Sequence, residues 1–353
     1  MSAGPDPALD TLLLPFVDGT LAWPQAGGAL FLGARAGWTL HRQPLPGLVC
    51  EQDFKPAADA LQRSGLSLRA PDDATARYPL LLLLPPRQRE QARALFARAL
   101  DCLAPGGTII ACMPNREGAK SGEADLARIA GPLQVLSKHH CRVFWTQPLT
   151  AAADPALAEA WRTLDAPRRV ADARVPGGNF LSRPGVFAWD RIDAASALLA
   201  EHLPGDLHGQ VADLGAGWGH LALQVLARCP DVTALDLYEA DARALELARA
   251  NLQAQAARVP LGFHWHDVTA GLPRRYDAIV SNPPFHAQGR EERTDLGRGF
   301  IAAAAAALQP GGRLWLVANR HLPYEAVLDA SFGSVRTVAQ RDGFKVVEAV
   351  RTR

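Results

Sequence analysis

The sequence predicts an α/β protein made of two similar halves, each an open parallel sheet with helices on both faces. Three observations support this fold class. The 353-residue chain is too long for one ordinary domain and suits two. In the second half, short apolar strand patterns alternate with helical patterns, as they do in parallel sheets. Landmarks of the second half also recur in the first, which indicates duplication of one α/β unit.

The repeated landmarks begin with a tyrosine, an apolar strand and a Pro-Pro pair. They occupy residues 78–86 in the first half and residues 276–284 in the second. In each half a helical stretch and then a Pro-Gly-Gly turn follow, at residues 105–107 and 310–312. Each turn leads into an apolar strand that ends near Asn-Arg. Because several landmarks align in the same order, chance similarity is the weaker explanation.

Between the repeats, residues 151–178 have the composition of a connector. The segment opens with Ala-Ala-Ala-Asp-Pro, closes with Pro-Gly-Gly, and contains a helical pattern at residues 155–164. We therefore expect a first domain at residues 1–150, this connector, and a second domain at residues 179–353.

Composition narrows the class of protein. Hydrophobic residues make up 48% of the chain and charged residues 21%, as in ordinary globular proteins. The N-terminus lacks the basic region of a secretory signal. The five cysteines are scattered without a Cys-x-x-Cys pair, so we expect reduced thiols, no metal site and a cytoplasmic protein. The net charge of +1 gives no global field that would mark a nucleic-acid binder.

The second half alternates strands and helices along the chain. The predicted strands lie at residues 211–214, 232–238, 261–266, 278–281 and 314–319, and the predicted helices at residues 220–228 and 240–255. Parallel sheets of this kind bind their ligands at the carboxyl ends of the strands.

A glycine-rich turn joins the first of these strands to the first helix. Asp213, Gly215, Gly217 and Gly219 occupy alternate positions in it, and glycine lets the backbone approach a ligand without a Cβ in the way. Glu239 ends the next strand, about 20 residues further on, where a doubly wound site places the carboxylate that holds ribose hydroxyls. This spacing indicates a nucleoside-bearing cofactor.

Two more acids compete for roles at this edge. Asp236 lies on the same strand as Glu239, but the following helix pattern is in register with Glu239, which we prefer. Asp267 closes the next strand, where it is placed either to accept from an adenine amino group or to start a turn; the context favours the ligand.

The main rival cofactor is a nicotinamide dinucleotide, whose fingerprint is Gly-x-Gly-x-x-Gly. In this turn the third glycine falls one residue early, and no Arg or Lys follows at once to grip phosphate. S-adenosylmethionine has no phosphate and fits better.

Residues 281–285, Ser-Asn-Pro-Pro-Phe, follow a later strand of the same half. A planar amino group is a poor nucleophile because its lone pair is delocalised. Asn282 offers a side-chain carbonyl and Pro283 a main-chain carbonyl held in place by Pro284, and two such acceptors would turn the lone pair toward a methyl donor. Phe285 offers a face on which an extruded base can stack. The segment favours N-methylation over a mere rigid turn.

With these residues in place, the chain resembles the bacterial small-subunit ribosomal RNA guanine-N2 methyltransferase C family, the RsmC-like proteins. The likeness is carried by residues 184–187 with Asp193, the glycine turn, residues 281–286, residues 317–324, residues 343–346 and, in the first half, residues 115–118.

The resemblance implies two tandem Rossmann-like class I methyltransferase domains, of which the first is degenerate and helps to grip RNA. It implies S-adenosylmethionine-dependent methylation of a guanine N2 in small-subunit (16S) ribosomal RNA, either free or in the assembled small subunit. We expect the protein to be a monomer. The predicted site comprises catalytic Asn282, Pro283 and Phe285; cofactor-binding Asp213, Gly215, Gly217, Gly219, Glu239, Asp267 and Asn282; and substrate-binding Pro284, His286 and Lys345.

Two alternatives stay open at this point. Enzymes that methylate adenine N6 or a protein glutamine use similar Asn-Pro-Pro-aromatic segments, but usually with Tyr where this chain has Phe285. The second alternative is a non-catalytic ribosome-assembly factor that kept the fold. The intact Glu239 and Asn282 argue against this alternative.

Overall fold

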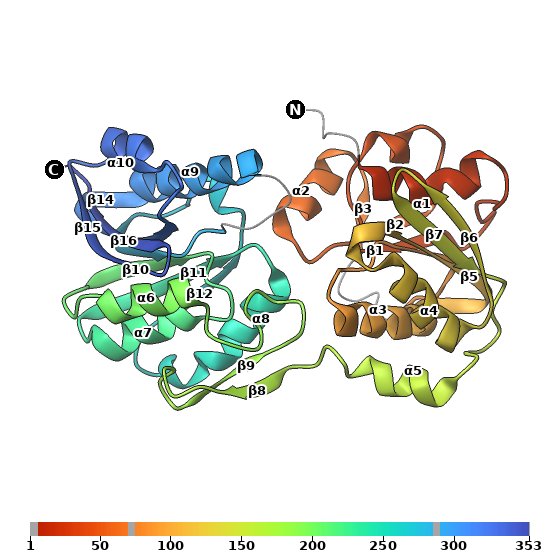
Figure 1. Ribbon diagram of the computed structural model, residues 1–353, viewed down its shortest axis with the longest axis horizontal. Helices are drawn as coiled ribbons and strands as arrows, with labels where there is room; N and C mark the ends of the chain where they lie inside the picture. The colour runs from red at the N-terminus through yellow and green to blue at the C-terminus, as the bar shows by residue number, and fades with distance from the viewer. Residues whose placement is uncertain (1–5, 70–74, 285–289, 353) are drawn as a thin grey trace. The chain divides into compact units, whose positions relative to one another are not determined.

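The computed structural model describes residues 6–69, 75–284 and 290–352. It divides into two compact units, Met1–Ala166 and Pro167–Arg353. Each unit contains one seven-stranded sheet with its helices (Figure 1). Among the described residues, no helix has both the length and the apolar character that crossing a bilayer requires.

The first unit begins with a helix and ends with one. Its elements are α1 (Pro7–Val17), β1 (Ala29–Leu32), η1 (Trp38–His41), β2 (Leu48–Glu51), α2 (Lys55–Arg63), β3 (Ser67–Leu68), β4 (Tyr78–Leu83), α3 (Arg89–Cys102), β5 (Leu103–Pro114), η3 (Asn115–Glu117), α4 (Ala119–Ala130), β6 (Leu133–Lys138), β7 (Cys141–Thr146) and α5 (Pro155–Arg162).

The second unit opens with a two-stranded hairpin that precedes its sheet. Its elements are β8 (Arg168–Ala171), β9 (Asn179–Ser182), α6 (Ala194–His202), β10 (Gly209–Leu214), α7 (His220–Arg228), β11 (Val232–Glu239), α8 (Ala242–Asn251), η4 (Gln253–Gln255), β12 (Leu261–Trp265), η5 (Val268–Ala270), β13 (Tyr276–Ser281), α9 (Arg290–Ala307), β14 (Leu308–Asn319), α10 (Glu325–Ser331), β15 (Ser334–Arg341) and β16 (Phe344–Val350).

Both sheets have the same strand order. It runs β3-β2-β1-β4-β5-β7-β6 in the first unit and β12-β11-β10-β13-β14-β16-β15 in the second. The first five strands of each order are parallel, and β7 and β16 run antiparallel to their neighbours. This identity confirms the predicted pair of α/β units. The prediction of wholly parallel sheets is wrong, because the last two strands of each unit form an antiparallel hairpin at one edge of the sheet.

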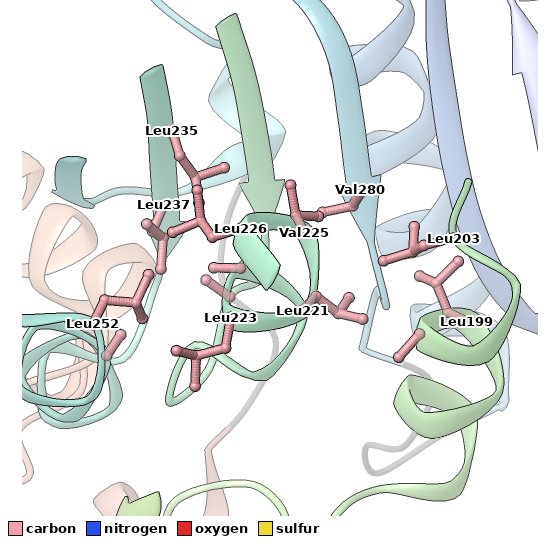
Figure 2. Close-up of a cluster of buried hydrophobic side chains, with 14 of the residues drawn as sticks. Leu199, Leu203, Leu221, Leu223, Val225, Leu226, Leu235, Leu237, Leu252 and Val280 are labelled. Carbon is pink, nitrogen blue, oxygen red and sulfur yellow. The ribbon is translucent and has the colours of Figure 1, made fainter. Parts of the chain in front are cut away.

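The core of the second unit lies on both faces of its sheet because side chains alternate along each strand. Val211 and Val280 face one hydrophobic cluster, and Leu214 and Ile279 face another. Figure 2 shows part of the first cluster, where Leu199 of α6, leucines of α7 and Leu252 lie beside strand residues that include Val280. Helices held on both faces leave the strand ends free to carry a site.

The predicted elements of this unit agree with the structure except at some ends. The helix expected over residues 240–255 is interrupted, since α8 ends at Asn251 and η4 follows it. The Asn251 amide donates to the carbonyl oxygens of Leu181 and Trp218, both at 2.9 Å, and accepts the Leu181 N–H at 2.7 Å. These tertiary bonds anchor the end of the helix to β9 and to the glycine turn.

Candidate active site

The two predicted motifs meet where the strand order of the second sheet reverses. β10 and β13 lie side by side with Leu214 opposite Ser281, so the glycine turn and Asn282 leave the sheet together. The Ser281 hydroxyl donates to the Leu214 carbonyl oxygen at 2.8 Å. Open parallel sheets bind ligands at such a reversal. A pocket lies there, and its walls include Gly215, Gly217, Asn282, Asp193, Ser196 and His220.

Glu239 ends β11 beside the glycine turn. Its carboxylate accepts the Gly217 N–H at 2.7 Å and the Asp241 N–H at 2.8 Å. Burial raises the pKa of Glu239, and these backbone bonds oppose the rise. The competing acid, Asp236, instead accepts from the Tyr276 hydroxyl at 2.7 Å within the buried sheet. The geometry therefore brings Glu239, and not Asp236, against the turn.

Asp213 is buried beneath the turn. One carboxylate oxygen accepts the Ala222 N–H at 3.0 Å, which holds the first turn of α7. The other oxygen has no hydrogen-bond partner in the described part of the chain. Burial is the main cause that raises the pKa of Asp213 to about 8, and the charge of Glu239 adds to it. Asp213 thus supports the turn from below.

The Asn282 side chain has two differently used ends. Its amide nitrogen donates to an Asp193 carboxylate oxygen at 2.9 Å and lies 2.7 Å from the Ser196 hydroxyl. A carboxylate only accepts hydrogen bonds, so the NH2 group must be the end that faces Asp193. The buried amide oxygen is left with no hydrogen-bond partner among the described residues. A buried unsatisfied acceptor costs roughly 1–3 kcal/mol, so a donor from a ligand would be favoured there.

Asp267 and Lys345 are not among the residues that line this pocket. Asp267 caps η5, where its carboxylate accepts the Thr269 N–H at 2.9 Å and the Thr269 hydroxyl at 2.6 Å. Lys345 is buried in β16 and pairs with Glu325 of α10. Pro283 is buried and Pro284 is exposed. Phe285 and His286 fall outside the described residues.

Comparison with known proteins identifies the family. The Methyltransferase small domain model matches residues 177–348. The ribosomal RNA small subunit methyltransferase C of Pseudomonas paraeruginosa is 34% identical over 293 residues, which span 82% of this chain and 83% of the relative. The protein of the same name from Escherichia coli K12 is 32% identical over 81% of this chain and 80% of its own length. The chain belongs to the ribosomal RNA small subunit methyltransferase C family.

A solved structure extends the likeness to both halves. The Thermus thermophilus 16S rRNA N2 G1207 methyltransferase (RsmC), in complex with AdoMet and guanosine, superposes with a TM-score of 0.80 and 28% sequence identity. The match covers 98% of this chain and 92% of that one. The fold is therefore a tandem pair of class I methyltransferase domains, as the resemblance implied.

In this member of the methyltransferase C family, the first unit repeats the backbone of the site with different side chains. Gly33 has φ +69° and follows β1, as Gly215 with φ +72° follows β10. The register of the strands places Leu84 at the position of Asn282. Gln52 follows β2 as Glu239 ends β11, and its amide nitrogen donates to the Ala34 carbonyl oxygen at 2.7 Å. The backbone turn is kept, while an apolar side chain replaces the Asn282 amide and a neutral amide replaces the Glu239 carboxylate.

Several pocket residues were not predicted as part of the site. Asp193 and Ser196 lie at the start of α6, where Asp193 caps the helix by accepting the Ser196 N–H at 2.9 Å. The Asp-x-x-Ser spacing before an apolar run signals a cap, but not a contact with Asn282.

His220 is buried with neither ring nitrogen hydrogen-bonded within the described ranges. Burial lowers the pKa of His220 to about 4, so the imidazole is neutral. Trp218 stacks on Phe180 at a centroid distance of 3.9 Å.

The buried Asp213 predicts a pH-dependent stability. The carboxyl pKa is near 3.9 in an unfolded chain and about 8 in the folded protein. The folded state therefore retains a proton that the unfolded chain releases, and this contribution to stability is full below pH 4 and is lost as the pH rises through 8. We expect the melting temperature of the parent protein to fall relative to that of Asp213→Asn between pH 5 and pH 8.5. Parallel melting curves for the two proteins would contradict this.

Two glycines of the turn should respond differently to alanine. At Gly219, with φ +94°, a Cβ would lie 2.5 Å from Leu252 Cδ1, whereas at Gly217, with φ +55°, no described atom lies within 4 Å. We expect Gly219→Ala to lower the free energy of unfolding by about 2–4 kcal/mol, through left-handed strain and overpacking. Gly217→Ala should cost about 1–2 kcal/mol, through strain alone. Urea denaturation measures both, and equal losses would contradict the account.

Proposed function

We propose that the protein transfers a methyl group from S-adenosylmethionine to the exocyclic N2 of a guanine in 16S ribosomal RNA. The buried, unpaired amide oxygen of Asn282 carries this proposal, because it lies at the sheet reversal beside the glycine turn. The names of the curated relatives and the guanosine bound to the Thermus thermophilus enzyme support the same substrate class.

The residues present fit S-adenosylmethionine. Glu239 is positioned to hold the ribose hydroxyls next to Gly217. The space beside Gly217 is open, because a Cβ built there would have no described atom within 4 Å. Gly215 and Gly219 shape the turn, Asp213 supports it, and Asp267 is proposed to accept from the adenine amino group by giving up part of its bonding to Thr269. When bound, the cofactor supplies an electrophilic methyl group on sulfur.

The chain itself supplies positioned hydrogen-bond acceptors. We assign the Asn282 amide oxygen to one N–H of the guanine amino group and the Pro283 main-chain carbonyl to the other. Acceptors fixed before the reaction need little reorganisation in the transition state, and holding the reactants in line removes much of the entropic barrier. Phe285 is proposed to stack on the extruded base, with Pro284, His286 and Lys345 on the RNA side.

The first unit is proposed to help grip RNA without binding cofactor. Leu84 stands where the second unit has Asn282, so the acceptor for an amino group is missing. Gln52 stands where the second unit has Glu239, so a neutral amide, whose oxygen accepts the Phe54 N–H at 2.8 Å, replaces the carboxylate proposed to hold ribose. In this proposal the protein acts as a monomer in the cytoplasm, on ribosomal RNA or on the small subunit that contains it.

Product analysis tests the proposal. Purified protein, S-adenosylmethionine with a labelled methyl group, and unmodified 16S ribosomal RNA or small subunits should yield N2-methylguanosine after nuclease digestion and mass spectrometry. Label in N6-methyladenosine, or in a protein glutamine of the subunit, would favour another N-methyltransferase. A protein that binds RNA but shows no saturable uptake of S-adenosylmethionine would be an assembly factor.

A further inference from the structure

The start of α6 contacts the reacting end of the pocket. Asp193 precedes α6 and Ser196 lies in its first turn, yet both contact Asn282, which follows β13. The amide nitrogen of Asn282 donates to Asp193 Oδ2 at 2.9 Å and lies 2.7 Å from Ser196 Oγ. All three residues line the same pocket of the second unit.

These contacts distinguish the two orientations of the amide. If the Asn282 amide were flipped, its oxygen would face the Asp193 carboxylate, which has no proton to donate. The flip would also turn the NH2 group to the place where an acceptor is required. A charged acceptor makes the stronger hydrogen bond, so the observed orientation is the favoured one.

The same carboxylate oxygen also fixes the helix. Asp193 Oδ2 accepts the Ser196 N–H at 2.9 Å as the cap of α6, so it receives two donors, one from the helix and one from Asn282. The position of the Asn282 amide is thereby tied to the backbone of α6, which packs through Leu198 and Leu199 into the core. A rigid anchor of this kind is what an acceptor needs in order to act without reorganising.

We propose that Asp193 and Ser196 are positioning residues that hold the Asn282 amide with its oxygen toward the amino group to be methylated. The inference rests on the proposed function for the identity of that amino group. The inference deepens the proposed function by assigning the orientation of the Asn282 acceptor to Asp193 and Ser196 at the start of α6.

The test compares variants that keep the helix cap. Asp193→Ser can still cap α6, but its side chain is too short to reach Asn282, whereas Asp193→Asn keeps an acceptor oxygen at the same place. We expect Asp193→Ser to lower kcat by about 10- to 100-fold, the loss typical of one charge-assisted hydrogen bond. KM for RNA and Kd for S-adenosylmethionine should stay within about twofold. Asp193→Asn should recover most of the rate, and Ser196→Ala should give a smaller loss.

A double-mutant cycle separates positioning from a direct role. If Asp193 acts through Asn282, Asp193→Ser should add no further loss of kcat to Asn282→Ala. The proposal would be overturned if the losses of kcat in the two single variants multiplied in the double variant. A parental kcat in Asp193→Ser, or weakened cofactor binding by that variant, would also overturn it.

A second readout does not depend on the reaction. In protein labelled with 15N-asparagine, the Asn282 side-chain NH2 signals, assigned by their absence from Asn282→Asp, should exchange slowly with solvent in the parent protein and fast in Asp193→Ser. Equal exchange would overturn the proposal. The value of kcat counts all methyl transfer, and the product is identified separately. A product other than N2-methylguanosine would therefore refute the proposed function. The exchange of the Asn282 NH2 signals would still decide whether Asp193 positions the amide.

Discussion

Asn282→Ala is expected to lower kcat for RNA methylation by about 10²- to 10³-fold, the effect of removing one preorganised hydrogen-bonding group from a reacting centre. The amide oxygen is buried and has no hydrogen-bond partner among residues 6–69, 75–284 and 290–352, so its removal breaks no bond of the free protein through that atom. Loss of the amide oxygen therefore falls on the transition state, whereas loss of the amide nitrogen removes the bonds to Asp193 and Ser196 in the free protein. Initial rates with labelled S-adenosylmethionine measure it, and isothermal titration should give a cofactor Kd within about twofold of the parent value.

The first unit offers the matched control. Leu84 occupies the same position after β4 that Asn282 occupies after β13. Leu84→Met, which conserves volume and polarity, should leave kcat unchanged. A parental rate in Asn282→Ala, or an equal loss in Leu84→Met, would remove Asn282 from the catalytic role.

Glu239→Gln is expected to weaken S-adenosylmethionine binding by about 10- to 100-fold, because one or more hydrogen bonds to a charged acceptor are lost. The Glu239 carboxylate accepts two backbone N–H groups, from Gly217 and Asp241, so a glutamine amide cannot satisfy both and a ligand at once. Isothermal titration measures the affinity, and thermal melting separates it from a loss of folding.

Gln52→Ala is the control for this change. Gln52 has the matching position in the first unit and donates to Ala34 there. It should leave the cofactor affinity unchanged because that unit is proposed to bind none. Parental affinity in Glu239→Gln would instead point to another carboxylate as the partner of the ribose.

Local pattern was enough to predict the fold and the centre of the candidate site. The duplication is visible because Tyr78 and Tyr276 begin strands that end in the same Pro-Pro pair. Helix register favours Glu239 over Asp236. In the structure, Glu239 lies against the glycine turn, whereas Asp236 is bonded to Tyr276 within the sheet. These features depend on short stretches of chain whose periodicity and spacing are fixed by strand and helix geometry.

Contacts between distant segments were not predictable. Asp193 and Asn282 are separated by 89 positions, and only the packing of α6 against the sheet brings them together. The early end of α8 has the same origin, because Asn251 bonds to Leu181, 70 positions away. Lys345 is a further example, because nothing in the sequence pattern indicates its pairing with Glu325, 20 positions away. Sequence spacing carries no information on such tertiary partners.

The most direct measurement is a crystal structure of the protein with S-adenosylhomocysteine and guanosine. The account predicts the guanine N2 at hydrogen-bond distance, about 2.7–3.2 Å, from the Asn282 amide oxygen, with the ribose hydroxyls of the cofactor on Glu239. A cofactor bound away from the β10–β13 reversal, or an Asn282 oxygen turned from the guanine amino group, would contradict it.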